Sequence, residues 1–178
     1  RAVVRRMKAA TRGAMGVPLT IAGSDPTGGA GLEADLKVFA AFGLSGAAIA
    51  TALTEQDTRA VHAVHALEAK LVRRRLARLL DDVRVAGAKT GLLASAKQVR
   101  VVADAVREYE ISPLVVDPVL APTRGKPFLD ERGRKTLWRK LLPLAAVFTP
   151  NLDEAATLLG STRAAIEKHP ERARSEER

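Results

Sequence analysis

With 178 residues, of which 47% are hydrophobic and 28% charged, the sequence has the size and composition of one folded domain rather than of a disordered or fibrous chain. It contains no cysteine, no apolar run long enough to span a bilayer and no secretory signal, which excludes disulfide scaffolds, thiolate zinc sites, thiol nucleophiles and transmembrane helices. The net charge of +9 is concentrated near the N-terminus, and only 3% of the residues are aromatic, so we expect a cytoplasmic protein with no nucleic-acid or membrane partner.

Three parts are expected along the chain. Residues 1–14 form a basic N-terminal extension with five basic residues and no acid, and nucleic-acid binding is the alternative interpretation of its charge. Residues 15–160 form the folded body, in which no internal repeat or low-complexity linker marks a second domain. Residues 161–178 form a charged tail that contains no further buried strand.

Short apolar runs in the body predict five strands, which begin at Val17, Ala47, Val85, Pro113 and Ala145. None of these runs alternates polar and apolar residues, and such continuous runs are typical of a parallel sheet that is buried on both faces. Helical spacing of apolar residues follows each run, over 32–43, 70–83, 99–109, 137–142 and 153–159. We therefore expect an α/β sandwich with a mainly parallel sheet, helices on both faces and ligands at the carboxyl ends of the strands.

The first predicted strand ends in the glycine-rich sequence GSDPTGGAG, from Gly23 to Gly31, and a predicted helix follows it. Glycines let the backbone turn tightly and approach a ligand, and the N–H groups at the start of the helix can receive an anion or a polar ring substituent. The sequence matches neither a P-loop nor the dinucleotide-binding fingerprint. A turn whose glycines serve only packing is the alternative, so the loop alone does not predict a ligand.

Three more polar side chains are expected near this edge of the sheet. Asp35 lies on the first predicted helix, Gln56 follows the second predicted strand and Asp117 ends the fourth. A carboxylate accepts from a hydroxyl or amino group, and a glutamine amide can pair with a heteroaromatic ring, so the three suit a small polar ring. Lys89, which ends the third predicted strand, either faces an anionic substrate or emerges into solvent.

The fifth predicted strand ends in TPNLDE, with Asn151 and Glu154 three residues apart at the start of a helix. This spacing suits a helix cap in which Glu154 completes a capping box. It also suits a site for Mg²⁺ and phosphate, because hard cations prefer carboxylate and water oxygens, and the spacing alone leaves both interpretations open. The histidines form no ligand set with these acids, and His62 and His65 are expected on an exposed connection.

Five blocks carry a resemblance to a known family: TIAGSDPTGGAGLEADLKVFAAFG, TALTEQDT, AKTGLLAS, PLVVDPVL and TPNLDEAATLLG. Together they make residues 17–160 resemble the hydroxymethylpyrimidine/phosphomethylpyrimidine kinases of thiamine biosynthesis, in the ribokinase-like superfamily. The resemblance implies a ribokinase-like three-layer fold. It implies transfer of the γ-phosphoryl group of ATP to 4-amino-5-hydroxymethyl-2-methylpyrimidine and then to its monophosphate. It also implies Mg²⁺ as a cofactor, the aminopyrimidine and ATP as small-molecule partners, and commonly a homodimer.

The resemblance also matches eight residues to functional positions of the family. They are, for the aminopyrimidine, Gly23, Asp35, Gln56, Leu92 and Val119; for Mg²⁺, Asp117 and Glu154; and for the nucleotide phosphates, Asn151. Phosphoryl transfer depends on positioning and charge neutralisation more than on covalent chemistry, so metal-holding acids beside a neutral ring pocket are the parts to expect.

The sequence departs from the family pattern in several places. Leu92 replaces the usual methionine of the apolar wall, Asp57 replaces an asparagine beside Gln56, and the usual Lys-Ser-Gly-Asp loop reads Thr-Arg-Gly-Lys at 123–126. The adenine pocket and the Gly-Thr-Gly turn of the family have no counterpart after Leu159, so we expect a kinase domain without its C-terminal part. No catalytic residue is assigned, and inactivity of this chain is one expectation. The alternatives are a pyridoxal or pyridoxine kinase and a non-catalytic pyrimidine-binding module.

Overall fold

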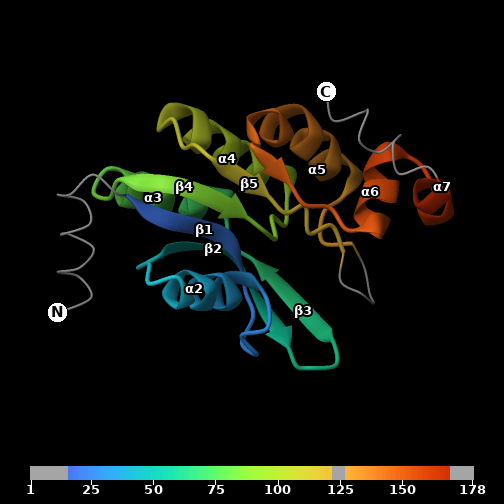
Figure 1. Cartoon of the computed structure of the whole chain (residues 1–178), viewed down its shortest axis with the longest axis horizontal. Coiled ribbons are helices and arrows are strands. Elements are labelled where there is room, and N and C mark those ends of the chain that lie inside the picture. Colours follow the sequence, from blue (N-terminus) through green and yellow to red (C-terminus); the bar gives the residue numbers. More distant parts are fainter. Residues whose placement is uncertain (1–15, 122–126, 169–178) are drawn as a thin grey trace.

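The computed structural model of the chain describes residues 16–121 and 127–168, and its centre is a six-stranded sheet (Figure 1). The strands lie in the order β3-β2-β1-β4-β5-β6, and all neighbours are parallel except β2 and β3. Their bounds are β1 Val17–Ser24, β2 Ala47–Gln56, β3 Val61–Ala66, β4 Val85–Thr90, β5 Leu114–Val116 and β6 Val147–Phe148. The predicted basic extension, the loop at 123–126 and the last ten residues of the predicted tail lie outside the described residues.

The five predicted strands are confirmed, and β1 shows why their sequences are continuously apolar. Ile21 of β1 pairs with Ile49 of β2 on one side and with Thr90 of β4 on the other, so β1 lies inside the sheet. Its residues Leu19 and Ile21 are fully buried, and Ala22, which faces the other way, is only 1% exposed. A strand with neighbours at both edges and cover on both faces is buried at nearly every position, so apolar residues predominate in it.

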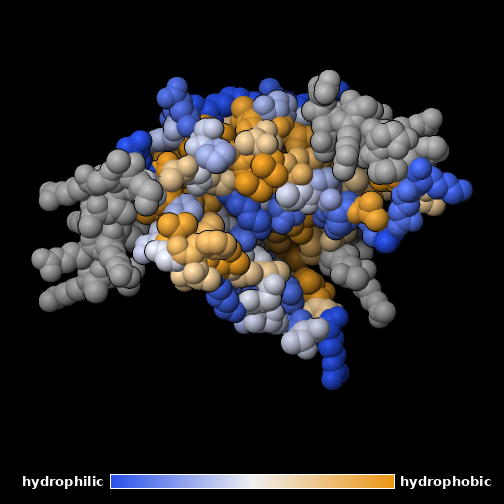
Figure 2. Space-filling view, viewed as in Figure 1, coloured by the Kyte–Doolittle hydropathy of each residue, from blue (hydrophilic) through white to orange (hydrophobic). Residues whose placement is uncertain are grey.

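The sixth strand, β3, corrects the prediction that His62 and His65 lie on a connection. Val61–Ala66 pairs antiparallel with β2, and the resulting hairpin projects away from the rest of the sheet (Figure 1). Both histidines are exposed, as expected, but they lie on this strand. The tip of the hairpin is hydrophilic (Figure 2). A half-exposed strand of small and polar residues lacks the apolar run that marks the other strands, so its sequence carries little strand signal.

The helices lie on both faces of the sheet, as predicted. The helix α2 packs over β1 and β2 on one face, and α3, α4 and α5 pack together on the other (Figure 1). The bounds are α2 Gly31–Ala41, α3 Ala69–Leu80, α4 Ala96–Glu108, α5 Glu131–Thr136, α6 Leu152–Leu159 and α7 Arg163–Lys168. None of the helices in the described ranges is both long and apolar enough to cross a membrane.

Two helical segments differ from the expected ranges. The helix predicted at 137–142 begins earlier, as α5, and continues as a π-helical turn over Leu137–Leu141 and a short 3-10 turn. The predicted charged tail begins with α7, whose Ile166 is 6% exposed and which packs against α6. The apolar residues of this short charged helix are only Ala164, Ala165 and Ile166, which are too few for a periodicity that predicts the burial of Ile166.

The main core lies between the sheet and the helices α3 and α4. It is formed by side chains that are at most 1% exposed, among them Leu19, Ile21, Val72, Leu76, Val99, Val102, Leu114 and Val116. The apolar stripe of α3 therefore faces the core, and its arginines Arg73, Arg74 and Arg75 face solvent. This core fixes the strands whose carboxyl ends carry the predicted site residues.

Candidate functional site

The glycine-rich loop between β1 and α2 is organised by Asp25, a residue that was not among the predicted site residues. Its carboxylate is 3% exposed and accepts from the N–H of Thr27 at 2.8 Å, the N–H of Ala30 at 2.9 Å and the hydroxyl of Thr27 at 3.0 Å. Burial raises the pKa of Asp25, but these hydrogen bonds outweigh it and hold the pKa below its ordinary value of 3.8. The loop is therefore closed around an ionised carboxylate.

Two glycines of this loop allow close packing. Gly31 has a φ of +60°, and a Cβ there would lie 2.3 Å from the carbonyl oxygen of Gly23. A Cβ on Gly23 would lie 2.9 Å from the Cδ2 atom of Leu92. The packing interpretation of these glycines is therefore confirmed, and the contact also brings two residues of the predicted pocket, Gly23 and Leu92, together. The ligand role of the loop stays a prediction.

Asp35 and Asp117 are joined through Lys89. The Nζ atom of Lys89 lies 3.1 Å and 3.2 Å from the two carboxylate oxygens of Asp35, and 3.4 Å from Oδ2 of Asp117. The hydroxyl of Thr20 donates to Asp35 Oδ2 at 2.5 Å. The three charged side chains are 15 to 30% exposed, so they are partly shielded from water. Lys89 does not simply emerge into solvent but is a cation shared by two acids, and its role towards an anionic substrate stays a prediction.

Gln56 lies at the carboxyl end of β2 and is linked to the end of β1. The hydroxyl of Thr54 donates to the carbonyl of Ser24 at 2.9 Å and lies 3.4 Å from Oε1 of Gln56. Gln56 is half-buried, so part of its amide remains available to a ligand. The structure thus brings Gln56 to the glycine-rich loop, but no described hydrogen bond joins it to Asp35.

The two predicted apolar walls come from loops that follow neighbouring strands. Leu92 follows β4 and is 7% exposed, and its carbonyl accepts from the hydroxyl of Thr51 at 2.5 Å. Val119 is half-buried in the loop after β5, two residues beyond Asp117. Because β4 and β5 are parallel neighbours, both loops leave the sheet at the same edge.

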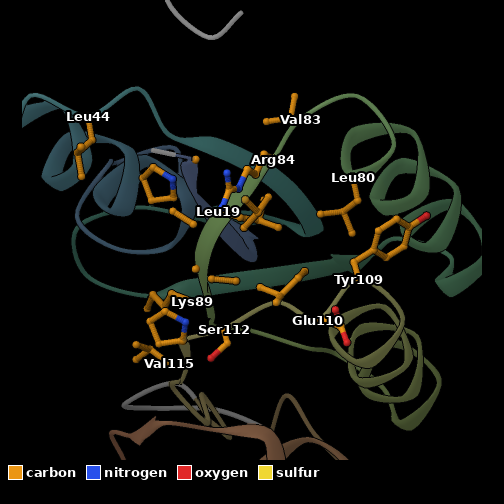
Figure 3. Close-up of a pocket in the computed structure, with 18 of the residues that line it drawn as sticks. Leu19, Leu44, Leu80, Val83, Arg84, Lys89, Tyr109, Glu110, Ser112 and Val115 are labelled. Atoms are coloured by element: carbon orange, nitrogen blue, oxygen red, sulfur yellow. The ribbon is translucent and has the colours of Figure 1, made fainter. Parts of the chain in front are cut away.

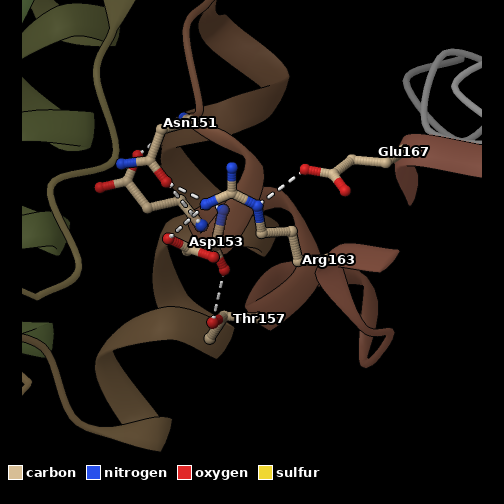
Figure 4. A network of polar contacts seen from close by, with 6 residues as sticks. Asn151, Asp153, Thr157, Arg163 and Glu167 are labelled. Carbon is tan, nitrogen blue, oxygen red and sulfur yellow. Dashed lines mark hydrogen bonds and ion pairs between the residues drawn. The ribbon is translucent and has the colours of Figure 1, made fainter. Parts of the chain in front are cut away.

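Asn151 and Glu154 form the capping box that their spacing suggested. Asn151 Oδ1 accepts from the N–H groups of Asp153 and Glu154 at 3.0 and 2.9 Å, and Glu154 Oε2 accepts from the N–H of Asn151 at 3.0 Å. Figure 4 shows this cap beside Arg163 of α7, whose guanidinium lies 3.6 Å from Asp153 and donates to Glu167 at 2.8 Å. The helix-cap interpretation is confirmed, and the Mg²⁺ role of Glu154 stays a prediction.

Glu154 also ties α6 to the loop after β5. Its Oε1 atom accepts from the N–H of Leu120 at 3.2 Å, and the side chain is only 8% exposed. Both oxygens of Glu154 are therefore engaged by backbone donors. The structure places Glu154 beside the loop that starts at Asp117, which makes it a support for that loop as well as a cap.

A groove of about 1000 Å³ lies elsewhere, at the amino ends of β1, β4 and β5 (Figure 3). Its lining includes Pro18, Arg84, Tyr109 and Pro113, none of which is a predicted site residue. Lys89 also lines it, although its ammonium is held by Asp35 and Asp117. Ligands of open α/β sheets bind at the carboxyl ends of the strands, so we place the candidate site there and not in this groove.

Comparisons with known proteins show the family to which the chain belongs. The model of the phosphomethylpyrimidine kinase family matches residues 25–177. The hydroxymethylpyrimidine/phosphomethylpyrimidine kinase of Escherichia coli strain K12 is 43% identical over 150 residues, which are 84% of this chain and 56% of the relative. The chain therefore spans about half the length of the curated relatives that it matches.

Solved structures of kinases have the same fold. The phosphomethylpyrimidine kinase of Clostridium difficile 630 is 37% identical, with a TM-score of 0.74, over 81% of this chain and 63% of that chain. The pyridoxal kinase of Staphylococcus aureus in complex with AMP-PCP and pyridoxal is 32% identical, with a TM-score of 0.72, over 83% of this chain and 52% of that chain. The three-layer fold expected from the sequence is confirmed by both.

Proposed function

The chain belongs to the phosphomethylpyrimidine kinase family, and from this premise we propose that its site serves the ATP-dependent phosphorylation of 4-amino-5-hydroxymethyl-2-methylpyrimidine and of its monophosphate. The observation that carries the proposal is the group formed by Asp35, Lys89 and Asp117 at the edge of the sheet where Gly23 and Leu92 also meet. Acids that can hold a cation lie there beside a neutral, partly apolar surface, which is what phosphorylation of a small ring requires.

In this proposal the ring is bound by groups from four elements. Asp35 accepts a hydrogen bond from a substituent of the ring, and the half-buried amide of Gln56 pairs with ring nitrogen and amino groups. Leu92 and Val119 cover its apolar faces. A carboxylate and an amide at fixed positions favour a ring with both donors and acceptors over a purely apolar one.

Asp117 is the residue that fits Mg²⁺ in this proposal. Mg²⁺ is commonly bound by one or two carboxylates together with substrate phosphates and waters. Asp117 is 30% exposed, and its contact with Lys89 involves only Oδ2. Within the described ranges no three acids or histidines gather into a metal-binding group. When bound, Mg²⁺ would neutralise phosphate charge, while Glu154 holds the loop and Asn151 lies near the phosphates.

We also propose a cellular location, a set of partners and an oligomeric state for the protein. A cytoplasmic location and the absence of a nucleic-acid or membrane partner are supported by the composition and the charge distribution of the sequence. A homodimer is supported by the family resemblance. The homodimer can be checked on the purified chain by its mass in solution, and nucleic-acid binding by titration with DNA at several salt concentrations.

Phosphorylation of pyridoxal is the second candidate function. It is favoured by the likeness to a pyridoxal kinase whose structure was solved with pyridoxal. Pyridoxal also carries a hydroxymethyl group on a nitrogen ring, so the same carboxylate and amide could bind it. A non-catalytic pyrimidine-binding module is the third candidate, because the proposed ring-binding groups of Asp35 and Gln56 could hold a ring without any phosphoryl transfer.

One experiment separates these functions. The purified chain is incubated with Mg²⁺, ATP and either the aminopyrimidine, its monophosphate or pyridoxal, and product is measured by mass spectrometry. Binding of each ring is measured in parallel by calorimetry without ATP. Product from the aminopyrimidine supports the proposal, and product only from pyridoxal supports the second candidate. Ring binding without product supports the module, and the absence of both contradicts all three.

A further inference from the structure

Two residues that were not matched to functional positions from the sequence hold Asp35, namely Thr20 on β1 and Lys89 on β4. We propose that Thr20 and Lys89 are positioning residues that occupy Oδ2 of Asp35 and leave Oδ1 as the acceptor oxygen for the ring, and that the positive charge of Lys89 also offsets the repulsion between Asp35 and Asp117. The proposal rests on the proposed function, because it takes Asp35 as the residue that receives the ring. Neither residue would touch the ring itself.

The contacts determine how much of Asp35 remains available. A carboxylate has two oxygens and about four acceptor positions. Thr20 and Lys89 both donate to Oδ2, and Lys89 also lies 3.1 Å from Oδ1. The hydrogen bonds from Thr20 and Lys89 therefore fill both acceptor positions of Oδ2, and the acceptor positions of Oδ1 are left for a ligand. Because Thr20 is fully buried and Asp35 is 15% exposed, water has little access to replace these donors.

A carboxylate with one free acceptor oxygen discriminates between ligands. A ring that offers one N–H or O–H donor at that point satisfies it, whereas a ring that offers none leaves the ionised oxygen without a partner in a partly buried place. The fixed orientation also removes the rotational freedom that an exposed aspartate would lose on binding. Thr20 and Lys89 therefore contribute affinity and selectivity through Asp35.

Lys89 has a second effect because both acids are within 3.4 Å of its Nζ atom. Its positive charge balances one of the two negative charges and opposes a divalent cation close to Asp117. Without it, Asp35 and Asp117 would form an uncompensated acidic pair that attracts a cation more strongly. Lys89 thus holds Asp35 in the orientation that binds the ring. It also lowers the affinity of the two acids for a free cation, so that a cation binds through Asp117 together with the phosphates.

The test compares four variants of the whole chain: Lys89→Met, Lys89→Arg, Thr20→Val and, as the matched control, Lys97→Met. Lys97 is an exposed lysine of α4 on the other face of the sheet. Affinity for 4-amino-5-hydroxymethyl-2-methylpyrimidine is measured by calorimetry without ATP or metal. Affinity for Mn²⁺ alone, as the probe for a divalent cation, is measured by electron paramagnetic resonance.

Lys89→Met is expected to weaken ring binding by about tenfold and to tighten Mn²⁺ binding by about threefold or more, since a charged hydrogen bond and a nearby positive charge are both lost. Thr20→Val weakens ring binding and leaves Mn²⁺ affinity unchanged. Lys89→Arg, which keeps the charge, stays near the wild type in both measurements, as does Lys97→Met. General damage to the fold cannot move the two affinities in opposite directions.

Several outcomes overturn the inference. The first is a Lys89→Met variant whose Mn²⁺ affinity is unchanged. The second is a Lys89→Met variant that loses ring affinity and Mn²⁺ affinity equally. The third is a ring affinity that stays the same in every variant. If the wild-type chain binds no ring, the proposed function fails. The Mn²⁺ measurement then decides the role of Lys89 by itself, because it needs no ring.

Discussion

The acids of the candidate site have different donors, and these donors determine what each acid can do. Asp25 accepts three hydrogen bonds from the loop that it organises, and both oxygens of Glu154 receive backbone N–H groups. Asp35 and Asp117 instead share the ammonium of Lys89. Asp25 and Glu154 therefore hold backbone segments together, whereas Asp35 and Asp117 are the acids that we propose to face a ligand.

At the residue scale, the structure makes a pH prediction for Asp57 on the β2–β3 hairpin. The hydrogen bond from His62, with the N–H groups of Arg59 and Ala60, lowers the pKa of Asp57 from its ordinary value of 3.8 to about 2. Because the folded pKa is lower than the unfolded one, the contribution of Asp57 to stability is present above pH 3.8 and is lost as the pH falls towards 2.

NMR titration of the Asp57 carboxyl carbon measures this directly. We expect a midpoint near pH 2 in the wild type and a midpoint closer to 3.8 in His62→Ala. His65→Ala is the matched control, because His65 pairs with Glu55 instead. A midpoint of Asp57 that stays the same in His62→Ala would show that the histidine is not its partner.

At the element scale, the start of α6 depends on its cap. Asn151→Ala removes the acceptor of two backbone N–H groups and is expected to lower the free energy of unfolding by about 1 kcal/mol. Urea unfolding followed by circular dichroism measures the change. Ser161→Ala, at an exposed position just after the helix, is the control. Equal stabilities of the two variants would contradict the importance of the cap.

Some elements of this fold could be predicted from the sequence, and others could not. The strands β1, β2 and β4 were predictable because buried parallel strands are continuously apolar, and the capping box was predictable from the spacing of Asn151 and Glu154. The strand β3 was not predictable, because it forms a strand through its pairing with β2 rather than through its own composition. The link from Asp35 through Lys89 to Asp117 joins three separate elements, and a single sequence does not contain such tertiary pairings.

At the scale of the whole molecule, the two faces of the sheet differ. Val116 of β5 belongs to the main core and is fully buried, whereas Val147 of β6 is 50% exposed. Apolar surface also appears around α2, where Val38 and Phe42 are 52% and 78% exposed (Figure 2). Stability therefore comes mainly from the face that α3 and α4 cover.

This asymmetry predicts unequal effects for one substitution at two valines. Val116→Ser should lower the free energy of unfolding by about 2 to 4 kcal/mol, because it removes buried apolar volume and buries a hydroxyl. Val147→Ser should change it by about 0.5 kcal/mol or less, since the side chain is already half in water. Denaturant unfolding of both variants measures the difference, and similar losses would refute the asymmetry.

The central claim is that the carboxyl edge of this sheet binds an aminopyrimidine through Asp35. Calorimetric titration of 4-amino-5-hydroxymethyl-2-methylpyrimidine into the wild-type chain and into Asp35→Asn tests it most directly, with the exposed Asp82→Asn as control. We expect one ring per chain, binding weakened by about tenfold or more in Asp35→Asn, and no change in Asp82→Asn. Absence of binding to the wild type, or equal binding to wild type and Asp35→Asn, would contradict the claim.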